Sequence, residues 1–351
     1  MAEEIAFAVK RITWSQYEHE TPILLQEANG PCPLIALVNT LLLQNDILQR
    51  EADFNPKSKS VGGAARHTES IGKIRALLHR HLDQNVPLNE VLACLGDVLL
   101  DVYDDLSVVN RLLENLPLLH TGLSVNPNVY RGGFPRDLSS EIFDAFGLHF
   151  VHGWIWDPLV DPRKDYFKRL QTFDDIQDFL LHPEEDPAAK ADIQQWLDNH
   201  STQLTAHGLK LLDEKIAPDS LAVFFRNNHF MTIYKAHDHD FYLLVTDLSL
   251  LGKCVWQLMV LVSGSEDLFF AGNFVPILEN SDLGLFNNHE DLNLVRQLQE
   301  EEDAAMAQRM QKKYEKRTPA LPKEKTEKKE KHAKNDNLDV PKKSKLLCVV
   351  V

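Results

Sequence analysis

The chain has few cysteines, and none of the cysteine patterns that build small secreted domains. Its 351 residues include only four, Cys32, Cys94, Cys254 and Cys348. They form no C-x-x-C pair and no close cysteine–histidine cluster, so the sequence predicts no disulfide framework, zinc site or other metal centre. This usage favours a reducing cytosolic or nuclear compartment. Cys94 and Cys254 lie within apolar runs, which is typical of core residues.

Long apolar segments are also missing. No run of 18 apolar residues occurs, and the acidic N-terminus lacks the basic and then apolar build of a secretory signal. We therefore expect neither a membrane-spanning helix nor a leader peptide. The hydrophobic content of 44% is enough for one large folded domain. We predict that this domain covers residues 1–280.

Basic charge is scarce in the first 310 residues. They carry a net charge of −22, whereas residues 311–347 carry +7, within a total of −15. Because nucleic-acid binding needs a basic face, the acidic body argues against nucleic acid as the main partner. It would favour association with a basic protein surface, and it is also compatible with ordinary solubility.

Cys32 stands out from the other cysteines by its setting. It lies in the motif N-G-P-C-P at residues 29–33, ahead of an apolar run over residues 34–43. Proline is favoured in the first turn of a helix, so the motif places Cys32 at a helix N-terminus, where the helix dipole favours a thiolate. Gln26 could donate its amide to the oxyanion formed when Cys32 attacks a carbonyl group. The alternative is that Cys32 is a small buried hydrophobic residue.

His229 is the candidate base for this cysteine. Residues 230–235 and 241–246 predict a β-hairpin with a five-residue loop. If Lys235 faces Phe241, paired residue numbers sum to 476, and Asp247 faces His229. Such a carboxylate would orient the ring of a cysteine–histidine hydrolase. A register slip of two would spoil this pairing, and the Asn-Asn pair before His229 could orient the ring instead.

Four motifs together resemble the MINDY family of cysteine deubiquitinases. They are N-G-P-C-P at residues 29–33 preceded by Gln26, H-G-W with a following D-P within residues 152–158, N-N-H-F at residues 227–230, and V-T-D at residues 245–247. The similarity extends over residues 12–276. It implies a papain-like α+β fold, hydrolysis of isopeptide bonds, and a preference for lysine-48-linked ubiquitin chains, without a cofactor.

The resemblance also implies roles for individual residues. Cys32 matches the family's nucleophile, His229 its base and Gln26 its oxyanion donor. The positions that contact ubiquitin map onto Val125, Trp154, Phe173 and Phe225, of which Phe173 replaces a usual tyrosine. We also expect Trp154 and Trp156 to alternate along a strand, so that at most one of them packs in the core.

Residues 281–314 predict an acidic helix with two similar units, at residues 291–298 and 303–310. Both units resemble the inverted ubiquitin-interacting motif, which implies that Leu294, Leu298 and Ala307 bind ubiquitin. Valine replaces the motif's alanine in the first unit. The alternative is an amphipathic helix that docks on its own domain.

The remaining residues differ from a folded domain. Residues 315–347 are rich in lysine, glutamate and proline, and this composition predicts a disordered basic linker. Residues 348–351, C-V-V-V, fit a C-a-a-X signal for prenylation of Cys348. A prenyl group with a polybasic neighbour gives stable membrane attachment. We therefore expect a cytoplasmic monomer that associates peripherally with membranes, with a nuclear pool as a further option.

Three functional hypotheses follow. The first is a deubiquitinase that cleaves lysine-48-linked polyubiquitin through a thioester on Cys32. The second is a membrane-tethered polyubiquitin receptor whose catalytic site is silent or autoinhibited. The third is an acyltransferase with the same cysteine–histidine–aspartate chemistry. Gln26 disfavours the silent receptor, and the lack of an evident acyl-CoA or nucleotide loop disfavours the acyltransferase.

Overall fold

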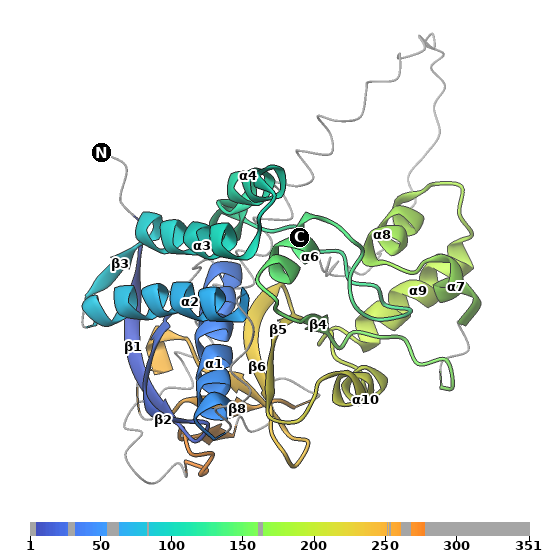
Figure 1. Ribbon diagram of the computed structural model, residues 1–351. Coiled ribbons are helices and arrows are strands. Elements are labelled where there is room, and N and C mark those ends of the chain that lie inside the picture. Colours follow the sequence, from blue (N-terminus) through green and yellow to red (C-terminus); the bar gives the residue numbers. More distant parts are fainter. Residues whose placement is uncertain are drawn as a thin grey trace, which may run out of the picture. The chain divides into compact units, whose positions relative to one another are not determined.

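The structure is a computed structural model, and it describes residues 5–26, 32–54, 63–82, 84–160, 164–250, 252, 254–260 and 268–277 (Figure 1). The predicted helix of residues 281–314, with Leu294, Leu298 and Ala307, lies outside these residues. So do the predicted linker and the predicted lipidation site, Cys348. No helix among the described residues is both long and apolar enough to cross a membrane.

Helices and two sheets make up the described residues, so the α+β class is confirmed. The helices are α1 (Cys32–Phe54), α2 (Gly63–Arg80), α3 (Leu88–Val102), α4 (Leu106–Asn115), α5 (Leu118–Thr121), α6 (Leu138–Ala145), α7 (Lys164–Arg169), α8 (Phe173–Leu181), α9 (Pro187–Asn199), α10 (Ala206–Lys215) and the 3₁₀ turn η2 (Leu248–Leu250). Short polar residues cap several of them. The side chain of Thr172, for example, accepts the backbone N–H of Asp175 at the start of α8.

The smaller sheet is antiparallel. It contains β1 (Ala6–Trp14), β2 (Tyr17–Leu24) and β3 (Asn85–Pro87) in the order β2-β1-β3. The chain leaves β2 at Leu24 and reaches Gln26 two residues later, so this sheet fixes the position of Gln26.

The larger sheet has six strands. They are β4 (Phe150–His152), β5 (Ser220–Arg226), β6 (His229–Lys235), β7 (Phe241–Leu244), β8 (Trp256–Leu258) and β9 (Phe269–Phe270), in sequence order. β4 and β5 are parallel and the other pairs are antiparallel. The predicted hairpin register is confirmed, because Lys235 pairs with Phe241 and Ile233 with Leu243.

Helix α1 lies against both β2 and β6 (Figure 1). Of residues 33–47, only Gln44 is not buried, so this part of the helix is packed on nearly every side. Its buried Asp46 carboxylate accepts hydrogen bonds from Trp14 Nε1 (2.9 Å) and Thr21 Oγ1 (2.5 Å), and pairs with Arg75 on α2. These bonds join α1 to both long strands of the smaller sheet and to α2.

The expectation that only one of Trp154 and Trp156 packs in the core is wrong. Both are buried, with 2% and 1% of their surface exposed. Two reasons apply: residues two apart on a strand face the same side, and β4 ends at His152, so the tryptophans are not on a strand. Trp154 stacks on Trp196 of α9, and Trp156 stacks on Phe167 of α7.

His152 is a buried polar residue at the end of β4. Its Nδ1 accepts the backbone N–H of Trp154 (3.2 Å), which leaves Nε2 to donate to the carbonyl of Gly133 (2.8 Å). Burial lowers the pKa of His152 from 6.5 to about 4. The ring is therefore a neutral linker between the end of β4 and the Gly133 loop.

This pKa predicts a loss of stability in mild acid. Below its ordinary pKa of 6.5, His152 binds a proton in the unfolded chain but not in the folded one until about pH 4. The free energy of unfolding should therefore fall by about 3 kcal/mol through this group as the pH drops from 6.5 to 4. Urea denaturation between pH 7.5 and 4 measures the slope. His152→Gln should reduce it, and equal slopes in both proteins would contradict the assignment.

Candidate active site

Cys32 is the first residue of α1, as its sequence predicts. Its side chain is half-buried, and this burial raises the pKa of the thiol. Hydrogen bonds from the backbone of Phe230 and of Cys32 itself act in the opposite direction. The helix N-terminus adds a further influence that favours the thiolate. The thiol therefore lies against the backbone of Phe230, near the beginning of β6. Phe230 directly follows His229 in the sequence.

Two threonines fix how α1 lies along β6. Thr232 on β6 donates to the carbonyl of Ala36 (3.3 Å), and its hydroxyl also lies 3.0 Å from that of Thr40. Ala36 is one helical turn after Cys32, and Thr232 is two residues after Phe230. Helix α1 and strand β6 therefore run side by side from Cys32 and Phe230 onward. These buried hydrogen bonds hold Cys32 beside the start of β6.

His229 reaches this position through a tight turn. It pairs with Arg226 across the β5–β6 hairpin, which leaves only Asn227 and Asn228 in the loop. Their φ angles of 52° and 59° are left-handed, as a type I′ turn requires and as asparagine tolerates better than most residues. The Asn-Asn pair thus sets the hairpin turn that presents the histidine.

Gln26 and Asp247 lie side by side. They form an isolated parallel bridge, in which the Gln26 N–H donates to Thr246 O (2.8 Å) and the Leu248 N–H donates to Gln26 O (3.2 Å). The sequence had not linked these two residues to each other. Asp247 is exposed, and its carboxylate accepts the backbone N–H of Ser249 (2.7 Å). The described pairs between β6 and β7 end at Ile233, so the orienting role of Asp247 stays a prediction.

The four positions matched to ubiquitin contacts lie inside the core. Val125, Trp154, Phe173 and Phe225 have at most 2% of their surface exposed and belong to one hydrophobic cluster. In this conformation they support the fold and do not offer their side chains to a partner. Direct contact with ubiquitin would require a rearrangement, so this part of the interpretation stays a prediction.

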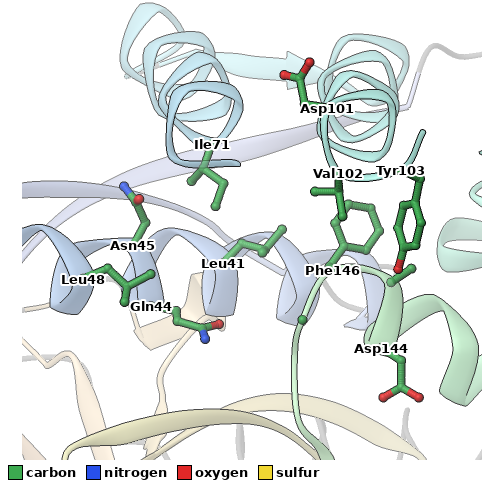
Figure 2. A pocket seen from close by; sticks show the side chains of 12 residues that line it. Leu41, Gln44, Asn45, Leu48, Ile71, Asp101, Val102, Tyr103, Asp144 and Phe146 are labelled. Carbon is green, nitrogen blue, oxygen red and sulfur yellow. The ribbon is translucent and has the colours of Figure 1, made fainter. Parts of the chain in front are cut away.

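A pocket of about 430 Å³ lies elsewhere on α1 (Figure 2). Its walls come from Leu41 to Leu48 of α1, from α2, from the end of α3 and from the end of α6. Leu41 follows Cys32 by nine residues, which is roughly 14 Å along the helix at the rise of an α-helix. The pocket contains none of the predicted catalytic residues, so it is not the place where Cys32 would react.

The contact between Cys32 and the start of β6 generates a prediction about thiol reactivity. In the predicted catalytic pair, a protonated His229 ring would favour the thiolate, whereas burial opposes it. His229→Ala should move the midpoint of the pH profile for Cys32 alkylation upward by about one unit or more. Mass spectrometry of the Cys32 peptide follows the reaction. His237→Ala, an exposed histidine of the β6–β7 loop, is the control. An unchanged midpoint in His229→Ala would show that the ring does not act on the thiol.

Comparison with known proteins places this geometry in a family. The family model for MINDY deubiquitinases matches residues 5–274. The ubiquitin carboxyl-terminal hydrolase MIY1 of Saccharomyces cerevisiae is 29% identical over 96% of this chain and 92% of its own length. MINDY-1 of Bos taurus is 31% identical over 74% of this chain and 52% of its own length, and human MINDY-2 is 29% identical over 76% and 40%. The chain thus spans about half or less of these two mammalian relatives.

The matched region contains every described residue of the candidate site, from Gln26 and Cys32 to His229 and Asp247. A match over most of the chain, together with these residues, establishes that the chain belongs to the MINDY deubiquitinase family.

Proposed function

We propose that this chain hydrolyses isopeptide bonds in lysine-48-linked polyubiquitin, with Cys32 as the nucleophile. The observation that carries the proposal is the contact between the Cys32 thiol, at the N-terminus of α1, and the backbone of Phe230, the residue after His229. A helix that bears the cysteine and packs on a sheet that bears the histidine is the arrangement of papain-like hydrolases. The relatives named ubiquitin carboxyl-terminal hydrolases support the substrate class.

The reaction has two steps. The Cys32 thiolate attacks the carbonyl carbon of the isopeptide bond, and the oxyanion is held by the Gln26 amide and the backbone N–H of Cys32. When the C–N bond breaks, His229 gives its proton to the departing lysine amine. The neutral ring then takes a proton from water, whose oxygen attacks the thioester. The products are a free ubiquitin carboxylate and the regenerated Cys32.

One observation favours a different function, a polyubiquitin receptor whose catalytic site is silent or autoinhibited. Burial raises the pKa of Cys32, which is the opposite of what a ready nucleophile needs. Binding of a ubiquitin chain would then have to change the surroundings of the thiol before hydrolysis. The two functions differ in whether chains are cut or only held.

Cleavage of ubiquitin chains distinguishes these functions. The purified chain should cut lysine-48-linked tetraubiquitin and leave the lysine-63-linked form largely intact, as followed by gel electrophoresis. Cys32→Ala should abolish cleavage, and Gln26→Ala should slow it by about 10²-fold, the usual cost of losing an oxyanion donor.

The other outcomes are equally informative. Binding without cleavage, lost on deletion of residues 281–314, would favour the receptor. Cleavage that survives Cys32→Ala would overturn the mechanism.

We also propose that the residues beyond the described structure assist this activity. The acidic helix predicted over residues 281–314 would hold further ubiquitin units through Leu294, Leu298 and Ala307. A prenyl group on Cys348, with Lys342, Lys343 and Lys345 just upstream, would tether the enzyme to a membrane. The sequence motifs support both statements.

The tether can be tested by fractionation. The full chain expressed in eukaryotic cells should be recovered with membranes, and Cys348→Ser should move it to the soluble fraction without changing chain cleavage in vitro. Cys94→Ser is the matched control. Equal distribution of the full chain and Cys348→Ser would contradict lipidation.

A further inference from the structure

The turn that presents His229 is held from outside the hairpin. Asn227 donates its backbone N–H to the side-chain oxygen of Gln203, at 2.9 Å. In a two-residue turn this N–H points away from the two strands, so the hairpin itself offers it no partner. Gln203 lies far from the turn in sequence, on the connection between α9 and α10.

Arg226, which pairs with His229 across the turn, also binds the connection between α9 and α10. Its Nε donates to the carbonyl of Thr202 (2.7 Å), and its Nη1 donates to the carbonyl of Val260 (3.0 Å), which follows β8. Arg226 is 6% exposed and Gln203 is 5% exposed. Both side chains are thus largely buried, and losing the partner of a buried donor is costly.

Gln203 takes an unfavourable backbone conformation to reach the turn. Its φ of 51° is left-handed, which a residue with a side chain rarely adopts. Its own N–H donates to His200 O (2.9 Å), at the end of α9. A strained residue persists only where its surroundings determine its position, and such residues concentrate at functional sites.

The connection that carries Gln203 is itself anchored. Thr205 donates its hydroxyl to Ile155 O (2.6 Å) and its N–H to Gly153 O (3.0 Å), and Leu204 forms a bridge with Gly153. A Cβ at residue 153 would lie 2.3 Å from Cδ1 of Leu204, so a larger residue there would require the Leu204 side chain to move. Residues 202–205 therefore form a fixed support between the segment after β4 and the catalytic hairpin.

We infer that Gln203 is a positioning residue for His229, acting through the Asn227 N–H to hold the turn from which β6 starts beside Cys32. The inference rests on the proposed function, in which His229 is the base. The side-chain oxygen of Gln203 binds the Asn227 N–H, two residues before His229. Its loss should affect the chemical step and leave substrate binding intact.

Two substitutions at residue 203 distinguish a role in positioning His229 from a role in the stability of the fold. Gln203→Met keeps the size of the side chain but loses the amide acceptor, whereas Gln203→Glu keeps an oxygen that can accept from Asn227. With lysine-48-linked tetraubiquitin, Gln203→Met should lower kcat about tenfold and leave KM within about twofold, because small displacements of catalytic groups slow the reaction strongly. Gln203→Glu should recover most of kcat. Gln194→Met, the same change at an exposed position of α9, is the control.

A second readout follows the cysteine directly. The midpoint of the pH profile for Cys32 alkylation should rise in Gln203→Met, as predicted for His229→Ala, because a displaced ring no longer favours the thiolate. A purely structural role would lower Tm and leave this midpoint and the kcat of the folded protein unchanged. That result would overturn the inference.

Arg226→Lys provides a second route if Gln203→Met does not fold. Lysine retains the charge but cannot donate to two separate carbonyls in the geometry of arginine. It should again lower kcat with KM preserved, and an unchanged kcat would count against the inference. Full activity of His229→Ala would instead overturn the proposed function itself, so the two failures can be told apart.

Discussion

The packing of helix α1 between the two sheets is the constraint on which the candidate site depends. Nearly every side of the helix is buried, and its polar contacts face in two directions. Asp46 bonds to Trp14 and Thr21 of the smaller sheet, while the hydroxyls of Thr40 and Thr232 meet at the larger one. Because an α-helix is stiff, contacts along its length also determine where its first residue lies. The position of Cys32 is thus set by the core.

The sequence predicted those parts of the site that local rules determine. The proline after Cys32 indicates a helix start, and a five-residue loop between two apolar strands gives the register that joins Lys235 to Phe241. The bridge between Gln26 and Asp247 could not be predicted in this way. It depends on how the segment after β2 packs against the segment after β7, and no local sequence pattern in either segment predicts that contact.

Exposure was a second property beyond the reach of sequence patterns. A family resemblance transfers the identity of a residue, but solvent access depends on its neighbours in three dimensions. Trp154 illustrates this, because it lies on no strand and stacks between α8 and α9, where Phe173 and Trp196 cover its ring. Residues two apart on a strand face the same side of the sheet, so alternation could not have separated Trp154 from Trp156. The strand also ended earlier than its apolar composition suggested.

The burial of Cys32 explains why the placement of the histidine matters so much in this chain. An exposed cysteine at a helix N-terminus gains thiolate character from the helix alone, whereas burial here raises the thiol pKa and opposes that gain. Further stabilisation of the Cys32 thiolate has to come from hydrogen bonds and from a neighbouring positive charge, and both depend on geometry. A two-residue turn of left-handed asparagines leaves little freedom between β5 and β6. Its outer N–H is in turn held by a buried glutamine in a strained conformation. The reactivity of the Cys32 thiol is therefore linked, through the backbone of the β5–β6 hairpin, to the connection between α9 and α10.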